Sequence, residues 1–411
     1  MNPHSPKSHL KDGSRATTYV HSSPSFNEEA LAAIRPEEAT DPKLVLKRYL
    51  SLRSVVSTAP SFAERYEAAI GTASEFRCIG AGTCGRVFKV PGTCNVFKIE
   101  NFDSDWLWND YLMHTEISEA FSLMGQAFTD VHVPKVHYFV GRHDEVWWDQ
   151  NIARFPKQFR TPSSVLCSER ILPLAKPIRE SLVDQYCPKH LVDELKNSKP
   201  NKDCLVRLYL GKRRRPQPSK FFTLRNFCLY LDQMEELELD IIHIAHLMAD
   251  ALAIMHWKAL IDANDVEFIL GSAPKRVAIP AVLARSLTSQ EIRDRPKHSS
   301  TWDSHIESFN GRTAHLWLID FNRCEKLTPD SAGVEKAVRA FFCNDPYYPR
   351  PHAILAKDQR LWASFRDRYL ATSKICVDAH IQDLPSKFID AVVEEGRKHM
   401  ARNKETGKSD V

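Results

Sequence analysis

Residues 79–88 read Ile-Gly-Ala-Gly-Thr-Cys-Gly-Arg-Val-Phe, a complete G-x-G-x-x-G-x-V glycine loop formed by Gly80, Gly82, Gly85 and Val87. The chain has only 14 glycines among 411 residues, so chance clustering does not explain the pattern. Glycine lacks the Cβ atom that would hold a ligand away, and such a loop therefore lets backbone N–H groups approach phosphates closely. Two nucleotide-binding folds use this loop, and the flanking sequence has to distinguish them.

The residues after the loop favour a β-hairpin over the strand-to-helix turn of a dinucleotide-binding fold. Two alternating β-rich runs, Arg-Val-Phe-Lys-Val and Val-Phe-Lys-Ile, are joined by the turn residues 91–95. The second run carries Lys98 in a setting that resembles the V-A-I-K strand of protein kinases, whose lysine holds the α/β-phosphates of ATP. Further on, Glu116 lies in a helical pattern over 107–126, where we expect it to pair with Lys98 as the αC glutamate does in kinases. The alternative is an ordinary glutamate on a surface helix.

The run 164–174 is expected to be the last strand of this β-rich region and to lead into a hinge. Its apolar residues end in Glu169-Arg170, and Pro173 follows. In kinase-like folds the adenine ring packs against this segment and bonds its backbone, so the identity of the side chains there matters little. We therefore expect Glu169 to lie beside the cofactor.

The kinase pattern next requires H-R-D-x-x-x-x-N, with an aspartate for the acceptor hydroxyl and an asparagine for a magnesium ion. Asp262 and Glu267 stand here at D-x-x-x-x-E, and glutamate is also a hard oxygen ligand for Mg²⁺. Counting from His256 instead places Asn264 or Asp265 at the position of the base, and both alignments remain open. If Asn264 occupies that position, proton acceptance is lost. A polar turn between a helix and a strand, without any chemistry, is the plain structural alternative.

A β-run over 314–319 ends in Asp320-Phe321-Asn322, which resembles the D-F-G of kinases, with Asp320 as the principal magnesium ligand. Asparagine can replace the glycine because it also accepts left-handed backbone angles. The next helical run, 333–342, follows closely, and no A-P-E is present. This leaves little room for a segment that binds a peptide. The shortness is shared with small-molecule kinases of the aminoglycoside and choline type.

Charge and cysteine content argue against several classes of protein. The net charge of +4, from 56 Lys and Arg against 52 Asp and Glu, indicates no particular polyanionic partner, so nucleic acid is not expected. The basic run 212–215 is most simply a solvated turn, with nuclear import or an anion contact as the minority reading. The ten cysteines form no C-x-x-C pair and no secretory apolar region opens the chain, which favours an intracellular protein, cytoplasmic or nuclear. No run of 18 apolar residues predicts a membrane span.

Two groups of residues are candidates for zinc. They are Cys187-Pro-Lys-His190 together with Cys204, and His243-x-x-His246 on a predicted helix. Neither group has a second, properly spaced pair of ligands, so we do not expect zinc.

The pattern of helices, strands and polar stretches divides the chain into several regions. Low periodicity and a composition rich in Ser, Pro, Lys and Glu predict a disordered N-terminal tail, and helices are expected near 42–56 and 60–71. The predicted regions are a tail at 1–40, helices and a β-rich nucleotide-binding lobe at 41–174, a family-specific insertion at 175–235, a helical C-lobe at 236–404 with a flexible insertion at 272–313, and a tail at 405–411.

The stretch from about 76 to 371 resembles a fungal family of unknown function that is commonly described as zinc finger protein. The motifs that carry the resemblance include I-G-A-G-T-C-G-R-V-F, E-R-I-L-P-L, N-K-D-C-L-V-R-L-Y-L-G-K-R-R, L-I-D-F-N-x-C and A-V-R-A-F-F-x-N-D-P-Y-Y-P-R-P. The resemblance implies no particular reaction. No finger is visible in this chain, and the description of the family is attributed to members that carry one elsewhere.

Together these patterns predict an α+β, bilobal protein-kinase-like fold with a β-rich N-lobe that carries the glycine loop and a helical C-lobe. ATP with Mg²⁺ is expected between the lobes. The leading function is a phosphotransferase of unknown acceptor. The alternative is a nucleotide-binding pseudokinase that acts on a protein partner as a regulatory or interaction module, and a zinc-dependent nucleic-acid binder is a distant third.

Overall fold

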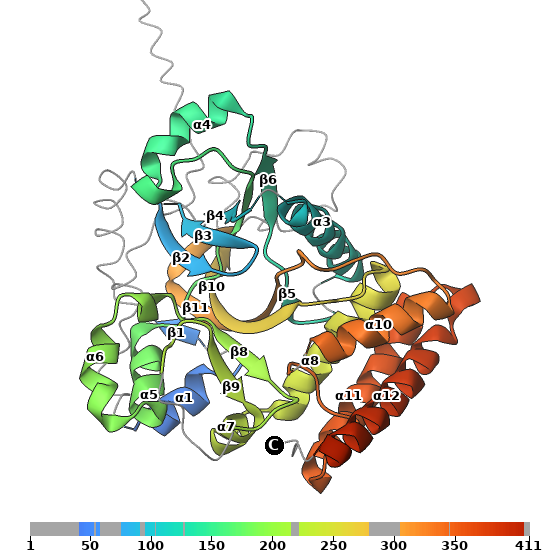
Figure 1. Cartoon of the computed structure of the whole chain (residues 1–411). Coiled ribbons are helices and arrows are strands. Elements are labelled where there is room, and N and C mark those ends of the chain that lie inside the picture. The colour runs from blue at the N-terminus through green and yellow to red at the C-terminus, as the bar shows by residue number, and fades with distance from the viewer. Residues whose placement is uncertain are drawn as a thin grey trace, which may run out of the picture.

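The computed structural model describes residues 41–52, 55–57, 75–90, 95–102, 104–125, 128–214, 222–278, 305–344 and 346–406. The predicted tail at 1–40 and the predicted helix at 60–71 lie outside these residues, as does most of the predicted tail at 405–411. The described part of the chain has an α+β fold (Figure 1).

A five-stranded antiparallel sheet forms the N-terminal region and confirms the predicted hairpin. Its order is β2-β3-β4-β7-β6. The register sets Phe88 opposite Phe97 on one face and Val87 opposite Lys98 on the other, since side chains alternate along a strand. The phenylalanine face is buried in an aromatic cluster, so the other face presents Lys98. The strands span Arg77–Ala81 (β2), Gly85–Lys89 (β3), Asn95–Glu100 (β4), Val136–Val140 (β6) and Val165–Glu169 (β7).

A second sheet has the order β1-β11-β10-β8-β9, and β5 pairs with β11 in parallel. At the two ends of the predicted flexible insertion at 272–313, β10 and β11 continue as a paired ribbon through 272–278 and 305–313. Residues 279–304 lie outside the description. The strands span Val55–Ser57 (β1), Val131–His132 (β5), Val206–Tyr209 (β8), Phe227–Tyr230 (β9), Glu267–Ala278 (β10) and His305–Ile319 (β11).

The helices α8, α10, α11 and α12 gather at the end of the molecule opposite to the five-stranded sheet (Figure 1). The helix predicted to carry His243 and His246 is α8, capped by Asp240 and followed by a π-helical turn over Ile254–Lys258. The helices span Pro42–Tyr49 (α1), Trp106–Met124 (α3), Glu145–Asn151 (α4), Lys176–Tyr186 (α5), Val192–Asn197 (α6), Leu231–Glu236 (α7), Ile241–Ala253 (α8), Ser331–Cys343 (α10), Ala356–Cys376 (α11) and Leu384–Thr406 (α12).

The first helix packs against a helix of the predicted insertion at 175–235. Leu46 and Leu50 share a buried core with Ile178 and Leu182 of α5, and the two helices lie side by side (Figure 1). An amphipathic helix takes the partner that covers its apolar face, whatever their separation in sequence.

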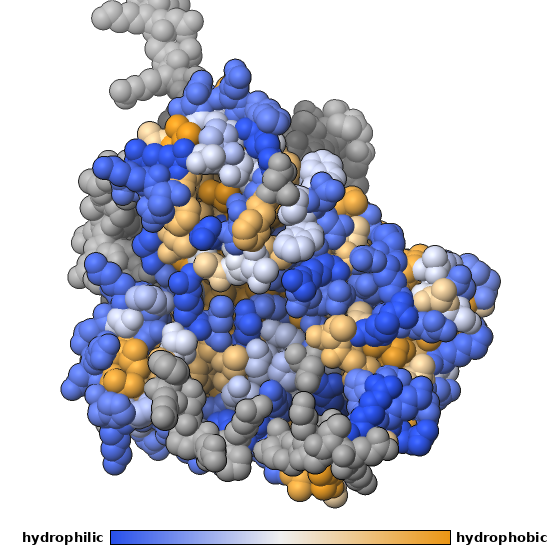
Figure 2. All heavy atoms as spheres, in the orientation of Figure 1, coloured by the Kyte–Doolittle hydropathy of each residue, from blue (hydrophilic) through white to orange (hydrophobic). Residues whose placement is uncertain are grey.

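The face of the molecule in Figure 2 is largely hydrophilic, with hydrophobic residues scattered over it. Within the described ranges, none of the helices combines the length and the apolar character that a membrane crossing requires.

Candidate functional site

Lys98 of β4 lies between two carboxylates from distant parts of the chain. Its Nζ atom donates to Oδ2 of Asp110 on α3 at 2.7 Å and to Oδ1 of Asp320, directly after β11, at 2.8 Å. The lysine side chain is 17% exposed and that of Asp110 is 4% exposed. Burial by itself lowers the pKa of Lys98, but the two carboxylates outweigh it and raise the pKa above its ordinary value. Lys98 is thus held as a cation beside Asp320.

The predicted pair of Lys98 with Glu116 is wrong, because Asp110 takes that place. Glu116 instead forms an ion pair with Lys326 near the surface. Asp110 stands on the buried stripe of α3 with Leu107 and His114, and its Oδ1 also accepts from the backbone N–H of Phe321 at 3.2 Å. The signal in the sequence that could have identified Asp110 is a charged residue among the apolar positions of an amphipathic helix.

Asp320 has a left-handed backbone with φ of 66°, which is strained for a residue with a side chain. Asparagine at 322 was expected to supply such an angle. In the Asp320-Phe321-Asn322 segment, the left-handed angle is at Asp320 itself and not at Asn322. The side chain of Asp320 forms the ion pair with Lys98.

The glycine loop is the tip of the β2–β3 hairpin. The N–H of Gly82 donates to the carbonyl of Gly85 at 2.9 Å. A Cβ atom at Gly85 would lie 2.6 Å from the carbonyl oxygen of Ile99, so the close approach of β3 to β4 requires glycine there. Asn101, after β4, donates its side-chain amide to the carbonyls of Gly82 and Thr83 at 2.8 and 3.0 Å. The tip is thereby tied to the end of β4.

Asp262 is buried, with 4% of the residue exposed, and joins two loops. Its Oδ1 accepts from the backbone N–H of Asn264 at 3.1 Å and from that of Glu325 at 2.9 Å. The amide of Asn264 in turn donates to the carbonyl of Arg323 at 3.2 Å. Burial raises the pKa of Asp262, although the two backbone bonds oppose the shift. These bonds fix the path of the segment after Asp320.

Asp265 and Glu267 lie within the electrostatic field of Asp320. Asp265 contacts Arg323 at 3.3 Å, and Glu267 pairs with Arg207 of β8 at 2.6 Å. Burial raises the pKa of Asp265, and the Asp320 carboxylate raises it further. Burial raises the pKa of Glu267 to about 7 against the opposing effect of Arg207, with added repulsion from Asp320 and Asp265. The structure thus brings Asp265, Glu267, Asp320 and Lys98 into one charged neighbourhood.

Glu169, the last residue of β7, bonds the segment that precedes β6. Its Oε2 accepts from the backbone N–H of Lys135 at 3.0 Å, and its own N–H donates to the carbonyl of Lys135 at 2.8 Å. Further along the expected hinge, Leu172 exchanges backbone hydrogen bonds with Ser272 of β10 at 2.9 and 3.1 Å. At Leu172 the hinge backbone is therefore engaged with the second sheet.

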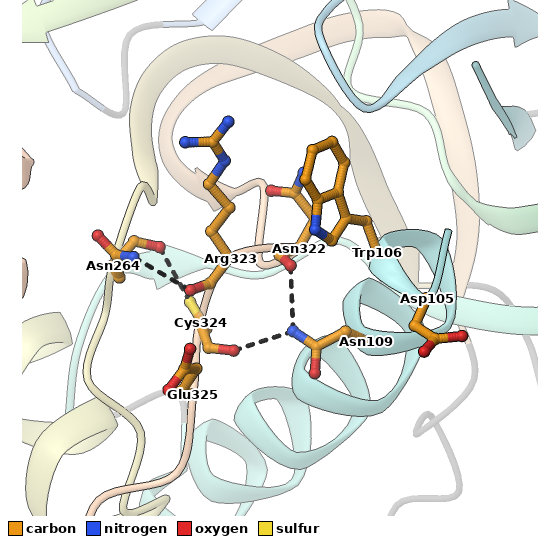
Figure 3. A pocket seen from close by; sticks show the side chains of 8 residues that line it. All are labelled: Asp105, Trp106, Asn109, Asn264, Asn322, Arg323, Cys324 and Glu325. Carbon is orange, nitrogen blue, oxygen red and sulfur yellow. Dashed lines mark hydrogen bonds between the residues drawn. The ribbon is translucent and has the colours of Figure 1, made fainter. Parts of the chain in front are cut away.

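A pocket of about 550 Å³ opens between α3, the loop of Asn264 and the segment after Asp320. Asn109 spans one wall, because its side-chain amide donates to the carbonyls of Asn322 and Cys324 at 3.1 and 2.9 Å (Figure 3). Most of the residues that line the pocket belong to no periodic pattern or motif, so sequence reasoning missed the pocket. It is lined by Asp105, Trp106, Asn109, Asn264, Asn322, Arg323, Cys324 and Glu325.

The residues that could bind a metal ion are not grouped in the described part of the chain. Within it, no group of three or more His, Cys, Asp or Glu residues is arranged so as to hold a metal ion. Of the zinc candidates weighed from the sequence, Cys187 and Cys204 are buried free thiols. His246 bonds the hydroxyl of Ser364 at 2.8 Å.

A family model described as "Zinc finger protein" matches residues 316–380. The match covers the end of β11, the segment of Asp320, α10 and all of α11. No curated protein matches the chain. The matched residues include Asp320, Asn322 and Arg323, so the similarity reaches one edge of the candidate site.

Proposed function

We propose that the chain is a protein-kinase-like, ATP-binding phosphotransferase that acts on an unknown acceptor. The observation that carries this proposal is the position of Lys98. This residue lies on β4, beside the glycine-bearing strand β3, and its Nζ contacts Asp320 at 2.8 Å. In phosphoryl transfer a lysine neutralises the nucleotide's phosphates, while an aspartate holds the metal that bridges them. Three segments far apart in the sequence contribute to this arrangement.

A bilobal arrangement is part of the proposal. Two separate hydrophobic clusters support it, one behind the five-stranded sheet and a larger one that includes the helices α8, α10 and α11. Lys98 belongs to the sheet and Asp320 follows β11 of the second sheet, so their ion pair joins the two parts. A ligand that binds between two lobes would meet both residues.

Asp320 fits the role of an oxygen donor for magnesium. Its side chain is 34% exposed and its bond to Lys98 uses Oδ1, which leaves Oδ2 for a metal. Glu267 pairs with Arg207 through Oε1, so its Oε2 could serve as a second oxygen ligand beside a cation. Asp320 would hold the magnesium ion, and the ion would supply positive charge that neutralises the phosphates during transfer.

The second candidate function is a nucleotide-binding pseudokinase. The burial of Asp262 favours it, because Oδ1 of this residue is already occupied by two backbone N–H groups. The ion pair of Glu267 with Arg207 points in the same direction. Under this alternative Asp262 is a structural residue, and the nucleotide regulates the contact with a partner.

Thermal unfolding tests the nucleotide site for both candidates. A ligand that binds only the folded state stabilises it by about 2.7 kcal/mol at 100 times its dissociation constant, so ATP-Mg²⁺ is expected to raise the midpoint. Lys98→Met should remove most of this shift, whereas Lys135→Met, at an exposed position before β6, should keep it. Unchanged midpoints at saturating nucleotide, with the folded spectrum intact, would refute the proposal.

A further inference from the structure

The pocket beside Asp320 contains a buried side chain without hydrogen-bond partners. Asn322 is 2% exposed, and neither its Nδ2 nor its Oδ1 has a partner. An amide buried in this way costs about 1 to 3 kcal/mol, because it has lost its bonds to water. Its backbone, in contrast, is fixed by Asn109 (Figure 3). The side chain therefore offers one donor group and one acceptor to a molecule in the pocket.

The lining of the pocket also contains an aromatic ring and a cation. Trp106 is 39% exposed, and the guanidinium of Arg323 lies 5.6 Å from the centre of its ring. Asn109 and Asn264 both donate to the backbone of 322–324, so the wall opposite α3 is held in one conformation. An indole face next to fixed amides suits a compact molecule with an apolar face and a polar rim.

The charges in the pocket disfavour an anion. Arg323 is paired with Asp265 at 3.3 Å, and Glu325 is paired with Lys336 at 2.5 Å. Asp105 adds a further carboxylate to the lining, and its side chain makes no capping bond to α3. The cation of Arg323 is thus already balanced, and the pocket has no surplus positive charge.

The pocket lies beside the proposed site of phosphoryl transfer. Burial and Asp320 raise the pKa of the Cys84 thiol at the tip of the glycine hairpin, and the nearby Arg323, three residues after Asp320, opposes the shift. Asn264 belongs to the same loop as Asp262 and Asp265. A molecule in this pocket would lie against the residues that surround the nucleotide's terminal phosphate.

We infer that this pocket binds the acceptor, and that the acceptor is a small, uncharged molecule with several hydroxyl groups. Its ring or carbon face would lie on Trp106, and its hydroxyls would bond the side-chain amide of Asn322. That the bound molecule is the phosphate acceptor rests on the proposed function. A hydroxyl oxygen would bond the γ-phosphorus while the bond from that phosphorus to the β–γ bridging oxygen breaks. ADP leaves with the electron pair, and the hydroxyl proton passes to Asp262 or Asp265.

Saturation-transfer NMR of the full chain without nucleotide tests the binding step. D-glucose and myo-inositol are expected to give saturable signals, glucose 6-phosphate a weaker one because it is anionic, and cyclohexanol a weaker one because it has a single hydroxyl. Trp106→Ala should weaken binding at least about tenfold, which corresponds to 1.4 kcal/mol. Trp108→Ala is the matched control, since Trp108 is on the same helix but packs on Phe139 outside the pocket.

Asn322→Leu separates ligand binding from folding. Leucine has a similar shape and no polar atoms, so this variant should keep or raise the thermal midpoint while it loses the signals of D-glucose and myo-inositol. A lower midpoint with binding retained would overturn the role of Asn322. No signal from either polyol, or a stronger signal from glucose 6-phosphate or cyclohexanol, would overturn the pocket's assignment.

Phosphorus NMR with ATP-Mg²⁺ and the bound polyol tests the transfer step. The expected result is a phosphomonoester signal that Asn322→Leu removes. Polyol binding with ATP-Mg²⁺ also bound but no ester formed would overturn the acceptor role. Polyol binding by a protein whose melting curve ignores ATP-Mg²⁺ would instead overturn the proposed function, so the two failures are distinguishable.

Discussion

At the scale of single residues, Asp110 is the unexpected member of the site. It lies six residues before Glu116 on α3, about 9 Å along the helix axis, so the helix meets β4 nearer to its N-terminus than the kinase pattern suggested. Its two oxygens serve different partners, since Oδ2 accepts from Lys98 and Oδ1 from the backbone N–H of Phe321. One carboxylate therefore positions both the lysine and the segment of Asp320.

Asp110→Asn should lower the free energy of unfolding by about 3 to 5 kcal/mol, because it leaves a buried cation with one partner fewer. Glu116→Gln should change it by less than about 1 kcal/mol, since the pair with Lys326 is partly exposed. Urea denaturation of both variants measures the difference. Equal effects of the two substitutions would show that Asp110 is not the principal partner of Lys98.

Asp262 decides between the enzyme and the pseudokinase. If it accepts the proton of the acceptor, Asp262→Asn should reduce turnover by about 10² to 10⁴-fold with little change in nucleotide affinity. Asparagine keeps a side-chain oxygen for the N–H groups of Asn264 and Glu325, so the fold should survive. Asp265→Asn is the companion variant, because the sequence leaves both positions open. Wild-type protein that binds ATP but neither transfers nor hydrolyses it would remove Asp262 from any catalytic role.

At the scale of elements, the glycine hairpin combines two different needs for glycine. At Gly85 a side chain would collide with the backbone of β4, 2.6 Å away. At Gly82 the nearest atom to such a Cβ is the carbonyl of Gly85 at 4.0 Å, so the protein itself leaves room for a side chain. Gly85 is therefore required by packing, whereas packing does not require Gly82, which we propose serves the approach of a phosphate.

Gly85→Ala should lower the free energy of unfolding on the order of 1 to 3 kcal/mol through overpacking. Gly82→Ala should change it by less than about 0.5 kcal/mol. For ATP-Mg²⁺ the second variant should bind about tenfold more weakly, because a methyl group intrudes on the loop's backbone N–H groups. Calorimetry of binding together with denaturant unfolding checks both parts. An unaltered affinity of Gly82→Ala would contradict a phosphate role for the loop.

The sequence predicted those elements whose side chains follow a strict period. The hairpin strands, α3 and α10 lie close to their expected bounds, since each has a face that must be buried. It did not predict the paired ribbon at 272–278 and 305–313, because strands pair through the backbone and polar sequences can do so as well. It also failed for Asp110 and Arg323, whose partners are 12 and 58 residues away and are set by the packing of distant segments.

At the scale of the whole molecule, the end of α8 connects the site to the helical region. His256 lies in the π-helical turn, fully buried, and its Nδ1 is 2.9 Å from the hydroxyl of Tyr369 on α11. The indole N–H of Trp257 donates to the same hydroxyl at 2.7 Å. Directly after this turn, the N–H of Ile261 bonds the carbonyl of Met255, so the loop of Asp262 starts from this buried junction.

This junction predicts a loss of stability in mild acid. Burial lowers the pKa of His256 from 6.5 to about 3, so the folded protein keeps it neutral where the unfolded chain protonates it. Between these two values the unfolded state binds one more proton, and the free energy of unfolding should fall by up to about 1.4 kcal/mol for each pH unit below 6.5. Above pH 6.5 this contribution is fully present and does not change.

His256→Gln removes the titrating group but keeps polar atoms for Tyr369. Its free energy of unfolding, measured with urea at several pH values between 5 and 6.5, should fall less steeply with decreasing pH than that of the wild type. The difference in slope should approach that of one bound proton at the lower pH values. His380→Gln, at an exposed position, should keep the wild-type slope. Buried His114, whose pKa is also lowered by burial, leaves a residual slope in both variants. If His256→Gln and the wild type lose stability in parallel, His256 is protonated in the folded state and the buried junction is not held as the structure describes.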